Sequence, residues 1–169
     1  MHRNRWSILL LAIVLSAATL LVGCTDGGEP QSGDAQGTQQ ANLQSVHFSW
    51  GGMMYMRVFE YDFELRDGDW WLVLLGYEQE ELLAAPLTQS ECQQLQEAVQ
   101  NADLPSWDGF DETNPNVLDG EGFWLEATYD DGTTVAAHGN NSFPDGYHAF
   151  KDTVLSIAAP YESELFGSE

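Results

Sequence analysis

Thiols, histidines and carboxylates are the side chains of this 169-residue chain that could carry out chemistry. Ser142, His138 and Asp145 are close in sequence, but a catalytic triad is a spatial arrangement, and the chain has no G-x-S-x-G nucleophile elbow. Paired carboxylates could hydrolyse a glycan, yet among 27 acidic residues some will be close by chance. These residues favour a non-enzymatic protein over an enzyme, and they predict no catalytic residue.

Metal sites have equally little support in the sequence. The three histidines beyond the N-terminal segment match no zinc spacing: His47, His138 and His148. A glycine-rich acidic loop offers the oxygen ligands that calcium prefers: Asp108, Asp111, Asp119 and Glu121. An EF-hand beginning at Asp111 would need glycine where Asn116 stands. We therefore expect diffuse cation binding, with no cofactor and no built metal site, and leave calcium binding by the 108–121 loop open.

The N-terminal sequence predicts a covalent modification of one residue, Cys24. Arg3 and Arg5 are followed by a run, residues 8–22, that is apolar except for one serine and one threonine. Because a membrane-spanning helix needs about 20 apolar residues, this shorter run is typical of a secretory signal. Leu21-Val22-Gly23-Cys24 then resembles the lipobox of bacterial lipoproteins. An ordinary signal peptide, or an uncleaved anchor with an incidental cysteine, is the alternative.

The lipobox resemblance implies that the Cys24 sulfur carries a diacylglycerol and that residues 1–23 are removed. Two acyl chains are enough for stable membrane attachment. The resemblance places the protein at the extracytoplasmic face of the cell membrane. Residues 24–43 are rich in Gly, Gln, Asp and Ser, which is typical of a flexible linker.

The charge of the chain limits its partners. Residues 24–169 keep three Lys and Arg against 27 Asp and Glu, a formal charge of −24. This excludes nucleic acid, because phosphate backbones are bound through Lys and Arg. Cations, basic proteins and neutral glycans remain possible partners.

Residues 44–161 are predicted to form one α+β domain, followed by an acidic, frayed tail at 162–169. Period-two alternation predicts strands over 45–50 and 59–66, and a hairpin at Asp67-Gly68 leads into a third strand over 70–77. A second hairpin turns at Asp130-Asp131-Gly132. We expect an antiparallel sheet of four or five strands with two helices packed on one face.

The register of the second hairpin decides where its side chains point. A two-residue turn would pair Leu125 with His138. A three-residue turn with a glycine bulge would pair Leu125 with Ala137 and Ala127 with Val135. We favour the second, because it buries the bulkier Val135 and turns His138 outward beside Trp124.

Two helices complete the predicted domain. Thr88 and Glu91 form a capping box before an apolar stripe that includes Cys92, which we therefore predict to be a core residue. The second helix, after the loop over 105–122 and the second hairpin, has its own stripe: Tyr147, Phe150, Val154, Ile157, Ala158 and Tyr161. Pro160 is expected to stop or bend it.

Aromatic side chains are the best candidates for binding. Trp71 is expected in the core, while Trp70, Trp124 and His138 are candidates for an exposed binding face.

The second half of the chain contains four motifs in succession: W-D-G-F, V-x-D-G-x-x-W-x-L, Y-D-D-G-T and G-x-N-x-F-P-x-G-Y-x-x-F. With the lipobox, they resemble an uncharacterised family of small bacterial lipoproteins and secreted domains, which implies location and fold but no site residues.

The sequence thus predicts a membrane-anchored lipoprotein that acts as a non-enzymatic binding or structural module. Its partners would be the membrane, through the anchor, and an envelope protein or glycan. Two alternatives stay open: a carboxylate-dependent hydrolase of cell-wall or glycan substrates, and a solute-binding accessory lipoprotein.

Overall fold

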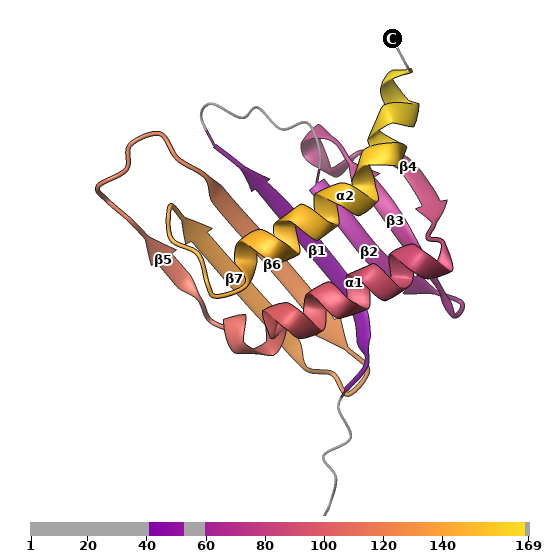
Figure 1. Ribbon diagram of the computed structural model, residues 1–169, viewed down its shortest axis with the longest axis horizontal. Helices are drawn as coiled ribbons and strands as arrows, with labels where there is room; N and C mark the ends of the chain where they lie inside the picture. The colour runs from indigo at the N-terminus through magenta and orange to yellow at the C-terminus, as the bar shows by residue number, and fades with distance from the viewer. Residues whose placement is uncertain (1–40, 53–59, 168–169) are drawn as a thin grey trace, which may run out of the picture. The chain divides into compact units, whose positions relative to one another are not determined.

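The computed structural model describes residues 41–52 and 60–167 (Figure 1). The predicted signal peptide, Cys24 and most of the predicted linker lie outside these residues. Seven strands of the described part form one sheet in the order β4-β3-β2-β1-β6-β7-β5. They are β1 (Leu43–Gly51), β2 (Glu60–Arg66), β3 (Asp69–Leu75), β4 (Glu81–Pro86), β5 (Asp111–Thr113), β6 (Gly122–Tyr129) and β7 (Thr134–Asn140).

Two α-helices, α1 (Gln89–Ala102) and α2 (Tyr147–Phe166), lie on the same face of the sheet (Figure 1). Two short 3-10 helices, η1 (Tyr77–Gln79) and η2 (Leu104–Trp107), join elements at the margins. The α+β class is confirmed, but the predicted number of four or five strands is too low. All strand pairs are antiparallel except β5 with β7, which is parallel.

The two strands that the sequence did not predict lie at the edges of the sheet. β4 has the sequence Glu-Leu-Leu-Ala-Ala-Pro, and Glu, Ala and Pro are depleted in strands. β5 lies within the segment predicted as a loop, and its three residues are all exposed. Only tertiary pairing defines β5, with Asp111 opposite His138. Neither strand therefore carries an alternating hydrophobic pattern.

Both hairpins turn where they were predicted to turn. Asp67 and Gly68 adopt positive φ values of 53° and 96°, which suits a two-residue turn between β2 and β3. Between β6 and β7, Leu125 pairs with Ala137 and Ala127 with Val135. This confirms the three-residue register, and it places Val135 in the core.

The predicted capping box begins α1. The Thr88 hydroxyl accepts a hydrogen bond from the Glu91 amide, and the Glu91 carboxylate accepts from the Thr88 amide. Leu95, Val99 and Ala102 of the stripe are buried. Cys92 is only half-buried, so its prediction as a core residue needs correction: it lies in the first turn, at the margin of the core.

α2 uses its predicted stripe, with Tyr147, Phe150, Val154, Ile157 and Ala158 all buried. It does not end at Pro160 but continues to Phe166, so residues 162–166 of the predicted tail are helical. Two contacts hold the continuation: the Tyr161 hydroxyl lies 3.0 Å from a Glu91 carboxylate oxygen, and Tyr61 donates to Glu162 at 2.7 Å. No helix in the described ranges is long and apolar enough to span a membrane.

Residues of the W-D-G-F motif and of the last motif, G-x-N-x-F-P-x-G-Y-x-x-F, meet in the core between the sheet and the helices. Trp107 is buried, donates to the Asp145 carbonyl oxygen at 3.0 Å, and meets the Phe150 ring edge-on at 5.6 Å. Gly146, at φ 82°, caps α2 so close to α1 that a Cβ would lie 2.9 Å from the Ala102 Cα. These motif residues hold α1 against α2.

Candidate functional site

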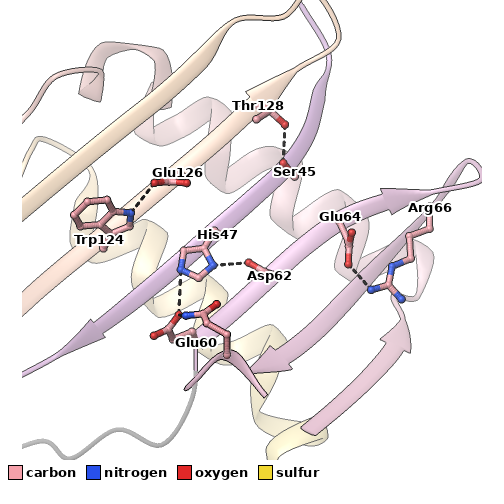
Figure 2. Close-up of polar contacts among 10 residues, drawn as sticks. Ser45, His47, Glu60, Asp62, Glu64, Arg66, Trp124, Glu126 and Thr128 are labelled. Atoms are coloured by element: carbon pink, nitrogen blue, oxygen red, sulfur yellow. Dashed lines mark hydrogen bonds and ion pairs between the residues drawn. The ribbon is translucent and has the colours of Figure 1, made fainter. Parts of the chain in front are cut away.

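The sheet face opposite the two helices carries a band of polar side chains, which we call the open face. Val46 and Phe48 point into the core, so the residues that alternate with them on β1 point to the opposite face. β2 and β6 alternate in the same way. Figure 2 shows most of the band from this face. Its members are Ser45, His47, Glu60, Asp62, Glu64, Arg66, Trp124, Glu126, Thr128 and His138.

His47 is the centre of the open face. Its Nδ1 lies 2.5 Å from Asp62 Oδ1, and its Nε2 lies 3.2 Å from Glu60 Oε2 (Figure 2). Since each ring nitrogen faces a carboxylate, both are placed to donate, which requires the imidazolium form. The hydrogen bond to Asp62 is the main reason that the pKa of His47 is raised, and the charges of Asp62, Glu60 and Glu126 raise it further against the effect of burial.

His47 lies opposite Asp62 on β2 and opposite Glu126 on β6, so three strands bring these groups together. The side chains of His47 and Asp62 are 25% and 33% exposed, so the cluster is accessible from solvent. A depression of about 230 Å³ lies over it, lined by Ser45, His47, Asp62, Phe63, Glu64, Glu126 and Thr128. The site is shallow and acidic, and it is built on three paired strands.

The flanks of the cluster have partners of their own. Trp124 donates from its indole N–H to Glu126 at 3.2 Å. The hydroxyls of Ser45 and Thr128 bond to each other at 2.6 Å. Arg66 pairs with Glu64, and its guanidinium lies over the Trp71 ring. Among the described residues, His47 is the basic side chain in contact with Glu60 and Asp62, and the charge of Glu126 also acts on its pKa.

Two of the three predicted binding-face residues meet on the open face. Trp124 pairs across the strands with His138, their rings lie 5.8 Å apart, and Trp124 is 47% exposed. His138 Nδ1 also lies 3.1 Å from Asp111 Oδ1 of β5. The favoured hairpin register is what turns His138 outward beside Trp124.

Trp70 does not join Trp124 and His138. It follows the alternation of Leu72 and Leu74 and packs, half-buried, against the core on the helix side. Trp71 takes the opposite place: it pairs with Glu64 and contacts Arg66 on the other face of the sheet. The expectations for the two tryptophans are thus exchanged. Because both faces of β3 are apolar beyond these two residues, no alternation of polar and apolar residues shows which face of the strand points to the core.

Three of the four candidate carboxylates of the 108–121 loop have separate partners. Asp108 accepts from the Ala136 amide, Asp111 faces His138, and Glu121 accepts from Lys151 and Tyr147. Among residues 41–52 and 60–167, no group of three or more His, Cys, Asp or Glu is placed to hold a metal ion. These three acids therefore contact separate parts of the fold.

The remaining reactive candidates lie apart from the open face. Cys92 is on α1, and burial, with the charges of Glu91 and Asp69, raises the pKa of its thiol. His148 is on α2, where its ring lies 5.2 Å from the ring of Phe143. Neither contacts the His47 cluster, and the raised pKa lowers the fraction of Cys92 in the nucleophilic thiolate form.

The residues that matter most on the open face were not predicted as a site: His47 with Glu60, Asp62 and Glu126. Strict alternation already put Glu60 and Asp62 on the solvent side of one strand. The missing information was that β1 lies between β2 and β6, which no local pattern predicts. No protein-family model matches the chain, and no curated protein is significantly similar to it. The family resemblance of the four motifs therefore stays a prediction.

Proposed function

We propose that this protein is a membrane-anchored lipoprotein whose open face binds a basic segment of another envelope protein. The observation that carries the proposal is the cluster of Glu60, Asp62 and Glu126 around His47, on a sheet face that neither α1 nor α2 covers. The lipobox at Cys24 supports the location. The formal charge of −24 supports attraction of basic partners.

Recognition at this face would use both charge and shape. Lysine or arginine side chains of a partner would replace or join His47 as donors to the three carboxylates. Trp124 lies beside them, 47% exposed, and a large exposed aromatic ring is the usual anchor of an interface. Its indole hydrogen bond to Glu126 holds the ring in place before binding.

The partners of the polar side chains on the open face favour binding over hydrolysis. The two hydroxyls in the depression, Ser45 and Thr128, bond to each other rather than to His47. The His47 ring lies between the carboxylates of Glu60 and Asp62 and contacts one with each nitrogen, so these two acids do not face each other across a substrate-sized gap. A shallow depression also excludes little water from a reaction.

A titration with a lysine-rich peptide tests the proposal. Calorimetry with the membrane-extracted protein is expected to detect binding that weakens with added salt. Replacing Glu60, Asp62 and Glu126 by their amides should weaken binding by about tenfold or more, because the direct charge contacts are lost.

The matched control removes the same number of negative charges from exposed positions of the helix layer, with Glu97→Gln, Asp152→Asn and Glu164→Gln. It should retain most of the affinity, because only long-range attraction changes. If both triple variants lose affinity equally, the peptide responds to net charge, and the open face is not the binding site.

A further inference from the structure

A second cavity lies on the helix side of the sheet, between α1 and the turn end of β6 and β7. We call it the α1 groove. Its volume is about 540 Å³, which lies within the roughly 300–1,000 Å³ typical of small-molecule sites. The side chains that could recognise a ligand in it are Trp70, Gln96, Gln100, Asp103, Tyr129 and Thr133.

Tyr129 is the most informative residue of the groove. It is 9% exposed, and its buried hydroxyl makes no hydrogen bond with any residue in the described part of the chain. Buried polar groups are nearly always paired, and less than 1 Å² of this hydroxyl oxygen is accessible, so a ligand oxygen can pair with it once the side chains that cover it move aside. Burial and the charge of Asp103 raise the pKa of Tyr129, which keeps the hydroxyl protonated as a donor.

Trp70 gives the groove one flat apolar wall. It is half-buried, with its inner part packed on the core. Gln96 and Gln100 are one turn apart on α1 and are both exposed at the groove, where each amide offers a donor and an acceptor. Asp103 adds an acceptor and Thr133 a hydroxyl.

The side chains that line the groove restrict the chemical class of ligand that can bind there. Among the described residues, its lining contains no Lys, Arg or His, and Asp103 is the one carboxylic acid there. An anionic ligand would find no counter-charge there and would be repelled by a chain of formal charge −24. A purely apolar ligand would leave the amides and the Tyr129 hydroxyl without partners.

We propose that the α1 groove binds a neutral saccharide of one or two rings. A pyranose ring has a face of C–H groups that packs on an indole, and a rim of hydroxyls that pair with amides, carboxylates and a tyrosine hydroxyl. Trp70 supplies the first kind of surface, and Tyr129, Gln100 and Asp103 supply the second. The groove lies on the helix side of the sheet, so this site is independent of the open face and its partner.

Saturation-transfer NMR with neutral sugars tests the proposal directly. The probes are glucose, N-acetylglucosamine, cellobiose and maltose, with glucuronate as the charged comparison, and the full protein is kept in a detergent without a sugar headgroup. At least one neutral sugar should bind with a Kd in the millimolar range or below, and glucuronate should bind more weakly.

Single substitutions inside and outside the groove test whether the sugar binds there. Tyr129→Phe and Gln100→Ala should each weaken binding by about fivefold, the loss of one hydrogen bond. Trp70→Leu should weaken it by about tenfold or more, because the stacking surface is lost. Gln93→Ala, on the same helix but outside the groove, should leave the Kd unchanged.

Folding of each variant is checked by its unfolding curve. Tyr129→Phe removes an unpaired group, so it should be at least as stable as the parent, which separates binding from structure. If Trp70→Leu does not fold, Tyr129→Phe and Gln100→Ala decide. Failure of every neutral sugar to bind, or binding that no groove variant weakens, overturns the proposal.

Discussion

Lys151→Met should destabilise the protein strongly, because Lys151 is the cation of a mostly buried ion pair. Its Nζ lies 2.6 and 2.7 Å from the two carboxylate oxygens of Glu121. The side chains are 12% and 20% exposed. The amine also lies 4.6 Å from the centre of the Trp50 ring. This contact joins α2 to the loop before β6.

The expected loss of stability depends on the contacts that Glu121 keeps when Lys151 is replaced. Without the amine, Glu121 keeps the Tyr147 hydroxyl, 2.5 Å away, as its side-chain partner among the described residues. Breaking one side of a buried pair costs about 3–5 kcal/mol, and we expect about 3 because both side chains retain some solvent contact. For a domain of this size, that lowers Tm by roughly 10 °C.

Urea and thermal unfolding followed by circular dichroism measure the effect. The double variant Lys151→Met/Glu121→Gln should be more stable than the sum of the single variants predicts, by about 1 kcal/mol or more, because the unpaired charge is gone. Asp152→Asn, the exposed neighbour on α2, should change stability by less than about 0.5 kcal/mol. A loss below about 1 kcal/mol for Lys151→Met would refute the reasoning and mean that water replaces the amine.

Three further predictions concern single residues. Cys24→Ala should abolish incorporation of labelled fatty acid, and a variant that is still labelled would rule out Cys24 as the lipid attachment residue. His47 should titrate by NMR above its ordinary pKa, and Asp62→Asn should lower that pKa. Because the folded-state pKa of His47 is raised, its stabilising effect is complete below the unfolded pKa and is lost as pH rises through the folded value, and an unshifted titration would contradict the paired geometry. Cys92 should react slowly with a thiol reagent in the folded protein and quickly in urea, since burial raises its pKa, whereas rapid labelling of the folded protein would show an activated thiol.

Local patterns in the sequence predicted those parts of the fold that local physics determines. The Thr88–Glu91 capping box, the Asp67-Gly68 turn and the 125–137 register all follow from contacts within about a dozen residues. The edge strands β4 and β5 do not, because β4 lacks β-formers and β5 is defined by its pairing with β7. Strand order lies beyond such patterns too, since β1 pairs with β6 across about 80 residues.

In the candidate site, too, local patterns predict some residues, and the others depend on the order of the strands. His138 beside Trp124 was predictable, because both lie in one hairpin whose register has a physical preference. Trp70 and Trp71 could not be assigned to faces, because β3 is apolar on both sides and either orientation buries a tryptophan. His47 gained its carboxylate partners only through the order of the strands.

Photo-crosslinking in living cells tests the central claim, binding at the open face, most directly. A photoreactive amino acid at Ala136, which is exposed and pairs across the strands with Glu126, would report on the open face. The same group at Glu97, exposed on α1, would report on the helix layer. If the open face is the binding site, position 136 should capture an envelope protein through a segment rich in lysine and arginine, and position 97 should not. Capture of the same protein from position 97 alone, or capture from position 136 through an acidic or uncharged segment, would contradict it.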